Sequence, residues 1–360
     1  MKSHQLPRII SLDNAGRLPV ADVGATGIKP GLIYALDNDS RFVEGNFSEP
    51  LTMFAIGYRD PNNLEATLEA LAPRVPVPGR LFEWKKWANA EEFYSEVDDV
   101  RAIGADFKRV EYTRADQTGK TLNKGLMMRV DLDQVVQVAG WQNTFVAKLL
   151  RRLMRNEIRR ASALLAGIAA NDDATWDASA DPDADVNNAL LLAADGSPAG
   201  EGTPAVDGLG FRPNRVVYGD SAWALRFASL RGNANAAKFL DAKLTPAELA
   251  TMLLVDLVYI SKERYQAASI AKAQIIGNKV LMFSAEPGAD VEDPSSVKRF
   301  VSAPTNLVSD ANFQRPAGAL DVNVYVQQLS PKLVDIYVEH NSNIIATSML
   351  GVRSLTVSAS

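Results

Sequence analysis

The chain has 360 residues and is 47% hydrophobic, so it can build a sizeable core and two or three structural units. Its 38 Lys and Arg against 43 Asp and Glu give a formal net charge of -5, which disfavours a general nucleic-acid-binding protein but leaves local basic patches open. The absence of cysteine excludes disulfides, thiolate zinc sites and cysteine nucleophiles. No signal-like apolar segment and no run of about 18 apolar residues occurs, so we expect a soluble, unsecreted protein.

Residues 1–50 alternate short apolar clusters with glycine, proline and asparagine. This spacing breaks helices and favours an extended arm that buries little surface by itself. We expect the arm to dock on the body of the protein or on a neighbouring subunit. After it, Asn63 can cap a short helix over 64–71, which ends at a run of prolines beginning at Pro73.

Residues 80–135 predict a long two-stranded excursion that is aromatic and acidic on its outgoing limb and basic on its return. Strand-like segments cover 107–112 and 126–132. Because two strands have no core of their own, we expect them to lie against another subunit. A solvated hairpin with ordinary surface charges is the alternative. The candidate intersubunit contacts are Glu91, Glu92, Asp98, Asp99, Arg101, Lys108 and Arg109.

Residues 141–170 form the longest uninterrupted helical pattern. A helix of this length is a rod of about 45 Å, and it is too charged to span a membrane. Its apolar stripe, spaced by three and four residues, comprises Val146, Leu150, Leu153, Met154, Ile158, Ala161, Leu165 and Ile168. A second face is basic, with Lys148, Arg151, Arg152, Arg155 and Arg159, and Glu157 is the one acid of the helix.

The segment after the long helix predicts a mixed α/β unit. Residues 171–187 are expected to be an acidic connector, 186–194 a short helix, and 195–210 a mobile loop rich in glycine and proline. A buried strand over 215–218 should lead into a helix with Asp220 as its N-cap.

Two further signals complete this unit. Thr245 and Glu248 form a capping box that opens a helix over 246–254, followed by a strand over 255–261. Gly277-Asn278 has the composition of a tight turn joining 274–276 to 279–283 as a hairpin.

The tail predicts two antiparallel strands, 322–326 and 333–338, joined at Ser330-Pro331. Two such strands need a partner surface. We expect them to cover the apolar stripe of the long helix.

Three patterns that suggest chemistry are incomplete. Gly119-Lys120-Thr121 resembles the end of a phosphate-binding loop, but Arg114 stands where the first glycine is needed. Asp181, Asp183 and Asp185 have the spacing of calcium ligands, but Val186 and Leu192 replace the required Gly and Glu; weak ion binding between subunits stays open. Gly219 to Trp223 lacks the second glycine of a nucleophile elbow, and a triad around Ser221 would need His340.

The order of these elements resembles the major capsid proteins of tailed bacteriophages with the Hong Kong 97-like fold. The phrases that carry the resemblance are APRVPVPGRLFEW with AEEFYSEVDDVRA, VEYTRADQTGKTLNKGLMMRVDLD before the long helix, and PNRVVYGDSAWALR. The resemblance covers nearly the whole chain, and the family has no catalytic signature to compare.

The resemblance implies an α+β fold and a division of labour along the chain. Residues 1–50 would be the N-terminal arm and 80–128 the extended loop. The peripheral domain would combine 51–79, 129–190 and 321–360, with 141–170 as its spine helix, and the axial domain would be 191–320. No residue can be matched to the lysine–asparagine crosslink of some members.

The function implied is a non-enzymatic structural protein that self-assembles, as hexamers and pentamers, into the icosahedral shell of a virion. The shell would enclose a double-stranded DNA genome, and the protein would be made in the cytoplasm of the host bacterium. Partners would be a separate scaffolding protein, because the chain has no long N-terminal scaffolding segment, together with a portal, a decoration protein and packaged DNA. No cofactor, metal or membrane is expected.

The basic face of the long helix has three interpretations within this function. It could approach DNA phosphates, pair with the acidic limb of a neighbour, or be a solvated face. Two other functions remain open: an encapsulin-type compartment that encloses protein, and a nucleotide-dependent α/β enzyme that uses Gly119-Lys120-Thr121.

Overall fold

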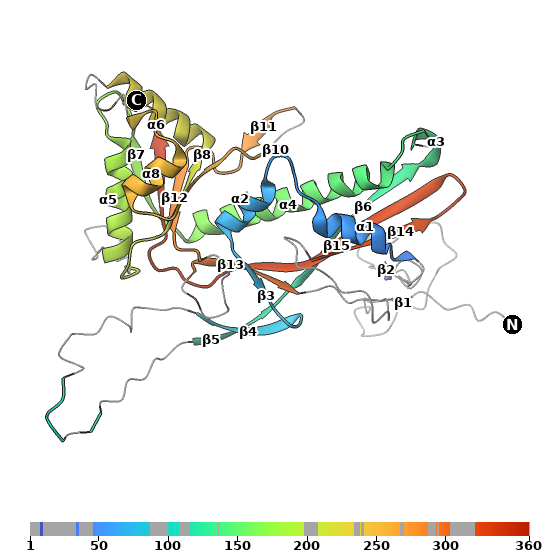
Figure 1. Ribbon diagram of the computed structural model, residues 1–360, viewed down its shortest axis with the longest axis horizontal. Coiled ribbons are helices and arrows are strands. Elements are labelled where there is room, and N and C mark those ends of the chain that lie inside the picture. Colours follow the sequence, from blue (N-terminus) through green and yellow to red (C-terminus); the bar gives the residue numbers. More distant parts are fainter. Residues whose placement is uncertain are drawn as a thin grey trace, which may run out of the picture.

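The computed structural model describes residues 8–9, 34–35, 46–86, 100–104, 106–107, 115–135, 137–197, 208–233, 238, 241–266, 270–286, 293, 295–302 and 321–359. Most of the expected arm lies outside these ranges, as do Glu91, Glu92, Asp98, Asp99, Lys108 and Arg109. The described part is an α+β fold in which two five-stranded sheets lie at different positions along one long helix (Figure 1).

The first sheet is organised around its longest strand, β15 (Leu333–Ala346). Its first half pairs with β14 (Val322–Gln328) and its second half with β13 (Val297–Ser302), which in turn pairs with β3 (Arg74–Pro76). Along its other edge β15 pairs with β6 (Leu122–Asp131), and the short helix α3 (Leu132–Val135) follows β6. The expected antiparallel tail strands are therefore confirmed, and they continue further than predicted.

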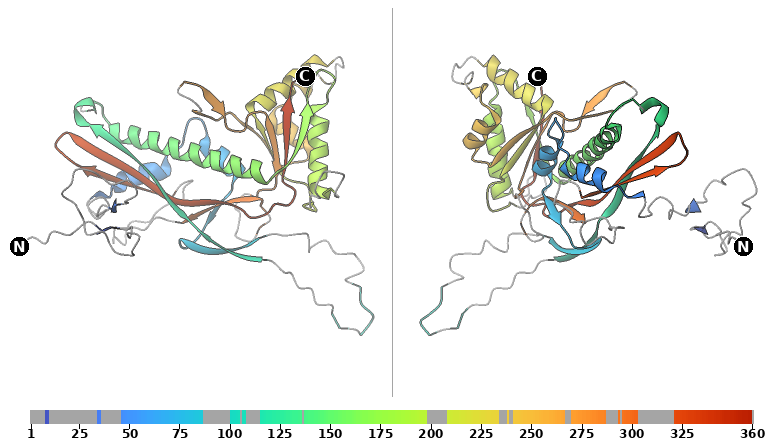
Figure 2. Two further views of the ribbon diagram at one scale, coloured as in Figure 1. Left: turned by 180° about the vertical axis from the view of Figure 1, so that it is seen from behind. Right: turned by 45° about the vertical axis from the view of Figure 1, so that its right-hand side comes forward.

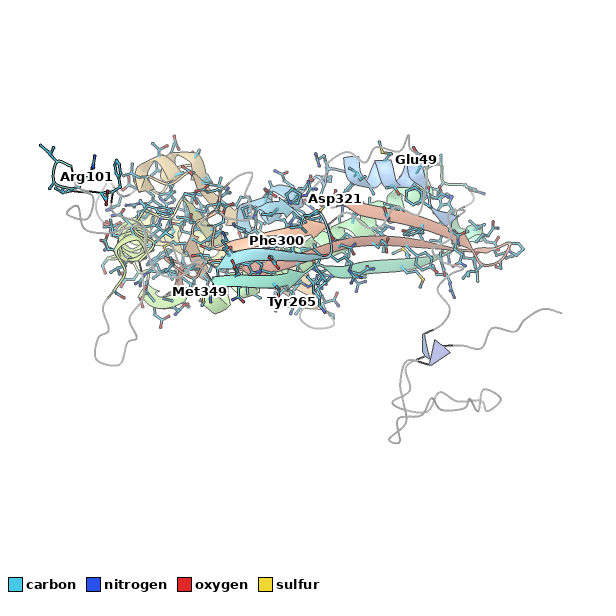
Figure 3. The ribbon with its side chains drawn as sticks, turned by 90° about the horizontal axis from the view of Figure 1, so that it is seen from below. Glu49, Arg101, Tyr265, Phe300, Asp321 and Met349 are labelled. Atoms are coloured by element: carbon cyan, nitrogen blue, oxygen red, sulfur yellow. The ribbon has the colours of Figure 1, made fainter. Side chains whose placement is uncertain are left out.

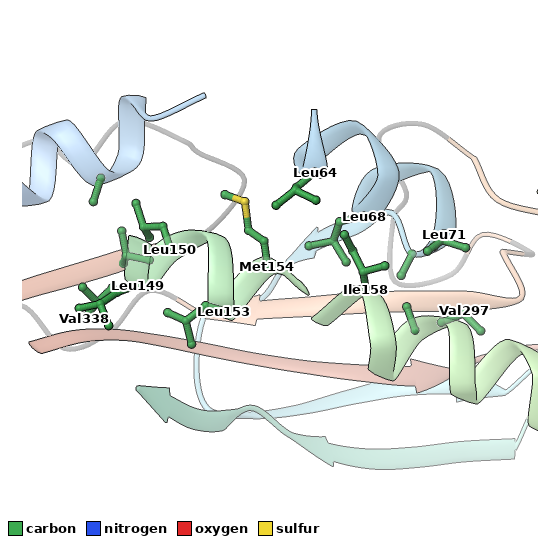
Figure 4. Close-up of a cluster of buried hydrophobic side chains, with 14 of the residues drawn as sticks. Leu64, Leu68, Leu71, Leu149, Leu150, Leu153, Met154, Ile158, Val297 and Val338 are labelled. Atoms are coloured by element: carbon green, nitrogen blue, oxygen red, sulfur yellow. The ribbon is translucent and has the colours of Figure 1, made fainter. Parts of the chain in front are cut away.

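The long helix α4 (Trp141–Ile168) packs on this sheet. Leu149 and Leu153 lie toward Val338, so the apolar stripe is covered by the chain's own tail strands, as expected (Figure 4). The helices α1 (Glu49–Gly57) and α2 (Leu64–Leu71) cover another side of α4, where Leu64 and Leu68 meet Met154 and Ile158. No helix in the described ranges is both long enough and apolar enough to cross a membrane.

The second sheet lies at the C-terminal end of α4 (Figure 2). Its strands follow the order β7 (Ala170–Thr175), β16 (Arg353–Ser358), β12 (Lys279–Phe283), β8 (Arg215–Gly219) and β9 (Leu257–Ser261). Its helices are α5 (Pro182–Asp195), α6 (Asp220–Gly232) and α8 (Pro246–Leu253), and they share a second apolar core with the strands. The predicted capping box of α8 is confirmed, with both Thr245–Glu248 hydrogen bonds present.

Three two-stranded ribbons complete the described fold. β4 (Leu81–Lys86) pairs with β5 (Ala115–Lys120), and β10 (Arg264–Gln266) pairs with β11 (Lys272–Gln274). The short strands β1 (Arg8–Ile9) and β2 (Tyr34–Ala35) pair within the N-terminal region.

Three local predictions were wrong, and for the two that concern strands the reason is that tertiary pairing decides where a strand forms. The expected acidic connector contains the strand β7 and the first turns of α5, because β16 offers β7 a parallel edge. Asp220 is the first residue of α6, and Gly219 is its N-cap. The segments beside Gly277-Asn278 do not pair with each other: β12 pairs with β8 and β16, while β11 pairs with β10.

The two sheets also exchange strands across the sequence. β13, from the segment expected to be axial, lies in the first sheet, and β16, from the tail expected to complete the peripheral unit, lies in the second. Each apolar strand pairs with the free edge that the fold brings to it, and proximity in the sequence does not control that choice.

Candidate assembly surfaces

The ribbon β4–β5 is fixed to the first sheet at its root. The rings of Phe82 and Phe300 stack with centroids 4.4 Å apart, and Trp84 joins the same apolar cluster. Gly119 allows this contact, because a Cβ there would come within 2.7 Å of the Phe82 ring. Val297 and Phe300 are three positions apart in β13, so their side chains lie on opposite faces of the sheet. Val297 belongs to the core that packs against α4. The ribbon therefore lies on the face of the sheet away from α4.

Between the two strands of this ribbon, the structure describes residues 100–104 and 106–107. Arg101 lies at one end of the molecule, apart from the sheet that carries Phe300 (Figure 3). Its guanidinium lies 4.0 Å from the centroid of the Phe107 ring. Ile103 and Phe107 are 108% and 82% exposed, and so much exposed apolar surface on an excursion is typical of a partner contact.

The basic face of α4 is divided between internal and external roles. The Arg151 Nε atom donates to the Tyr58 hydroxyl at 2.8 Å and lies 3.4 Å from Asp60, so Arg151 fastens the loop after α1. Arg155 lies 3.4 Å from Glu263, and the Arg159 guanidinium lies 4.1 Å from the Tyr265 ring centroid, so both contact the chain at β10. Arg151 therefore stabilises the fold of its own chain, a role that none of the three interpretations of this face included.

The remaining basic residues of this face point outward. Arg152 is exposed, and the Lys148 ammonium lies 4.8 Å from the centroid of the Phe145 ring on its own helix. Burial raises the pKa of Glu263, although the Arg155 guanidinium opposes the increase. Among the described residues, Glu263 is the one carboxylate beside the β10–β11 ribbon that pairs with this face, through Arg155.

Glu157, the one acid of the helix, does not lie on its basic face. It is fully buried on the side of α4 that faces the first sheet. Its carboxylate accepts hydrogen bonds from the Lys124 ammonium at 2.9 and 3.0 Å and from the Ser342 hydroxyl at 3.1 Å. Arg160 pairs with it from the helix. Burial alone would raise the pKa of Glu157, but the Lys124 and Arg160 cations outweigh it, so the pKa lies below its ordinary value.

His340 completes this buried polar cluster, which we define as Lys124, Glu157, Arg160, His340 and Ser342. It is fully buried and stands opposite Lys124 in the pairing of β15 with β6. Burial lowers the pKa of His340 to about 4, with a smaller opposing effect from Glu157. The ring is therefore neutral at pH 7.

Sequence reasoning missed this cluster, although one signal was present. Glu157 follows Leu153 by four residues and Met154 by three, so it lies on the apolar stripe rather than beside it. A carboxylate on a buried stripe requires a cationic partner. Nothing in the sequence says that the partner is Lys124, because β6 meets α4 only in the folded protein.

The three incomplete motifs have structural roles. Gly119 and Lys120 end the strand β5, and the Thr121 hydroxyl bonds the Ser302 hydroxyl at 2.7 Å, so the loop and following helix of a phosphate-binding motif are absent from this described segment. The Ser221 hydroxyl donates to the Gln274 side-chain oxygen at 2.8 Å, whereas His340 belongs to the cluster beneath α4.

The three aspartates begin α5 and face different partners. Asp181 caps the helix and pairs with Lys238. Asp183 accepts two hydrogen bonds from the buried Arg226 guanidinium, at 2.6 and 2.7 Å, and Asp185 accepts from the Trp176 indole at 3.0 Å. Their carboxylates are engaged separately, which argues against a shared calcium site.

A groove of about 270 Å³ lies where α4, the β10–β11 ribbon and β12 meet. Its lining includes the apolar side chains of Ala163, Ala166 and Leu281 and the cations Arg159 and Lys279. The Ser162 hydroxyl lies at this groove, buried and without a hydrogen-bond partner among the described residues.

The fold is similar to that of a phage-related protein from Bordetella bronchiseptica, with a TM-score of 0.56 and 15% sequence identity. The match covers 86% of this chain and 96% of that chain. The two proteins share a fold. This confirms, at the level of the fold, the resemblance found in the sequence.

Two other solved structures match with lower TM-scores, and we draw nothing further from them. They are a virus-like particle from Pyrococcus furiosus (14% identity, TM-score 0.45, covering 85% of this chain and 95% of that chain) and the holo-SrpI encapsulin complex from Synechococcus elongatus (12%, 0.44, 83% and 89%). The sequence matches no protein-family model and no curated protein.

Proposed function

We propose that this protein is a major capsid protein of a tailed bacteriophage, a non-enzymatic subunit that assembles into an icosahedral shell around double-stranded DNA. The observation that carries the proposal is the fold shared with a phage-related protein along 86% of the chain. The exposed apolar residues of the 80–128 excursion support it, since they suit a contact between subunits.

In this proposal each region has an assembly role. Residues 1–50 are the arm and 80–128 the extended loop, and both reach neighbouring subunits. The first sheet with α4 forms the peripheral domain, and the second sheet with α5, α6 and α8 forms the axial domain that gathers at the five-fold and local six-fold axes. Many modest contacts per subunit then make the closed shell collectively stable.

The remaining partners and the location follow from the same proposal. A scaffolding protein and a portal act during assembly, a decoration protein can bind the finished shell, and the protein resides in the virion after synthesis in the bacterial cytoplasm. No cofactor or catalytic step is part of it. The enzyme built on Gly119-Lys120-Thr121 is not favoured, because Gly119 and Lys120 lie in the strand β5. The protein-enclosing compartment is separated from the capsid by experiment.

The test is to remove the excursion without disturbing its root. Lys86 and Ala115 are paired at the end of β4–β5, so replacing residues 87–114 with a short Gly-Ser turn closes the ribbon where its pairing ends. We expect the wild-type chain, alone or with its scaffold, to form shells visible by electron microscopy. The shortened chain should keep its circular dichroism spectrum and stay unassembled.

Lys120→Ala is the matched control. The Lys120→Ala variant should assemble normally. Neither it nor the wild-type protein should bind ATP. Shells formed by the shortened chain at wild-type yield would contradict the role of the excursion, and a wild-type chain that stays monomeric under all these conditions would contradict the capsid function. The contents of shells isolated from producing cells, DNA or protein, separate a capsid from an encapsulin-type compartment.

A further inference from the structure

The groove between α4, the β10–β11 ribbon and β12 is lined by side chains from segments far apart in the sequence. Tyr265 faces α4 there, because the centroid of its ring lies 4.1 Å from the Arg159 guanidinium. Lys279 and Leu281 are two positions apart in β12, so both lie on the face of the second sheet that packs toward α4. Its volume of about 270 Å³ is close to that of small-molecule sites, which begin at about 300 Å³.

Most of the groove wall is apolar. Ala163 and Ala166 lie almost one turn apart on α4, and their small side chains leave the space beside the helix open. The remaining apolar lining consists of Ile275, Ile276 and Leu281, together with the Tyr265 ring. Walls of this kind remove the hydrocarbon part of a ligand from water.

The charged lining of the groove has one sign. Arg159 and Lys279 are cations, and no aspartate or glutamate lines the groove among the described residues. Neither cation pairs with a carboxylate in the part of the chain that the structure describes. The face of the Arg159 guanidinium lies over Tyr265, but its N–H donors lie in its plane and stay available to an oxyanion. The groove therefore favours an anion.

Ser162 adds a neutral donor to these cations. It lies almost one turn from Arg159 on α4 and lines the same groove. Its hydroxyl is buried and has no hydrogen-bond partner among the described residues. A buried polar group without a partner costs free energy, and an oxyanion beside Arg159 is an acceptor for this hydroxyl.

We propose that this groove binds a small organic anion, a molecule with an apolar body of about the size of two fused rings and a single carboxylate or similar oxyanion. The apolar body lies against Leu281 and Ile275, and the oxyanion meets Arg159 and Lys279. The site goes beyond the proposed function, because shell assembly by itself calls for no small ligand. Since α4 packs on the first sheet and β12 belongs to the second, a bound molecule also stabilises one sheet against the other.

A pair of matched ligands tests the charge requirement on the wild-type protein. The probes are naphthoate, which carries the carboxylate, and naphthamide, which has the same rings without a charge. Saturation-transfer NMR on the full-length unassembled protein measures both. We expect naphthoate to bind with a dissociation constant of about 1 mM or tighter and naphthamide to bind about tenfold more weakly. Naphthoate should also raise the thermal unfolding temperature.

Two variants place the binding in the groove. Lys279→Gln should weaken naphthoate about tenfold and leave naphthamide within about twofold of wild type, because only the charged ligand uses the ammonium. Ala163→Leu, at an exposed position of the lining, should fill the space and abolish saturable binding of both ligands.

Two control variants make the same changes elsewhere. Lys272 precedes Ala273, the partner of Tyr265 in the ribbon, so its side chain lies on the ribbon face away from α4. Lys272→Gln and Ala224→Leu, at an exposed position of α6, should both bind naphthoate within about twofold of wild type. Thermal unfolding checks that all four variants fold.

Three results would overturn the proposal: no saturable binding of naphthoate to the wild-type protein, equal binding of naphthoate and naphthamide, or equal weakening by Lys279→Gln and Lys272→Gln. Electron microscopy measures shell formation separately. Normal shells without naphthoate binding would therefore reject the groove and leave the capsid function standing.

The acidic limb of a second copy is tested as a competing occupant. The probe is a labelled peptide of residues 88–100 of this chain, followed by fluorescence anisotropy. Peptide binding that Lys279→Gln weakens, without any binding of naphthoate, would overturn the small-molecule site in favour of a contact between subunits.

Discussion

Glu157 and Arg152 lie about a turn and a half apart on α4, yet their charges work in opposite ways. Glu157 is fully buried against β6 and β15, where its carboxylate is held by Lys124, Ser342 and Arg160. Arg152 is exposed on the opposite side of the helix. Loss of a buried charge leaves its partners desolvated and unmatched, whereas loss of an exposed charge is compensated by water. The buried face should therefore govern folding, and the exposed face should govern binding.

Neutralising one charge on each face of α4 tests this division of roles most directly. We expect Glu157→Gln to lower the free energy of unfolding by about 3 to 5 kcal/mol, because Lys124 then stays buried without a counterion. Arg152→Gln is the matched variant and should change it by less than about 0.5 kcal/mol. Urea denaturation of the unassembled proteins measures both. Similar losses in the two variants would contradict the division of roles.

The pH dependence of stability tests the same buried cluster through His340. Its pKa is about 4 when folded, below the 6.5 of an exposed histidine, so between these pH values the unfolded chain binds a proton that the folded chain does not. Stability should therefore fall as the pH drops from 6.5 to 4, by up to about 3 kcal/mol. Glu157 has a lowered pKa, so its own contribution is lost only at lower pH.

The cause is the desolvation of the ring, opposed by Glu157 and reinforced by Lys124, Arg299 and Arg160. His340→Gln should remove the pH dependence in this window. The other histidine, His4, is the control, and His4→Gln should keep it. Thermal melts across the window measure the effect, and an equal slope in wild type and His340→Gln would contradict it.

A smaller effect is expected when both members of the buried pair become apolar. Lys124→Met with Glu157→Met removes two desolvated charges together, so the double variant should lose less than about 2 kcal/mol and be more stable than either single variant. A double-mutant cycle in urea measures the coupling. Additive losses would mean that the two side chains do not stabilise each other.

The smallest change in stability is expected at the acidic limb. Changing Glu91, Glu92, Asp98 and Asp99 to alanine should alter the free energy of unfolding by less than about 0.5 kcal/mol and still lower the yield of shells, because these charges serve a neighbour. The matched control changes four exposed acids elsewhere to alanine: Glu49, Asp173, Asp195 and Glu286. Particle yield by sucrose gradient and electron microscopy gives the answer. An unchanged yield in the limb variant would sink the proposed contact.

The helix α4 shows how far periodicity carries a prediction. Its length and buried stripe follow from apolar residues spaced by three and four, and the structure confirms both to within two residues at the C-terminal end. The same spacing contains Glu157, so the burial of that charge was present in the pattern. Hydrophobic periodicity reports which residues need burial, because it depends only on the geometry of one helix.

The strand pairings show where such reasoning stops. The acidic sequence of β7 did not predict a strand. β16 lies between β7 and β12, although the three strands come from distant parts of the chain. A strand of four to six residues is stabilised mainly by its neighbours, so the edge available in the folded protein decides whether and where it forms.

The long helix with its apolar stripe, the capped helix α8 and the antiparallel tail were predictable from the sequence alone, because each depends on neighbours a few residues away. The folded protein alone shows that Lys124 meets Glu157, that Arg151 turns inward to Tyr58 and Asp60, and that Arg159 lies over the ring of Tyr265. These contacts join residues far apart in the chain. Their energies depend on burial and distance, which are properties of the folded protein.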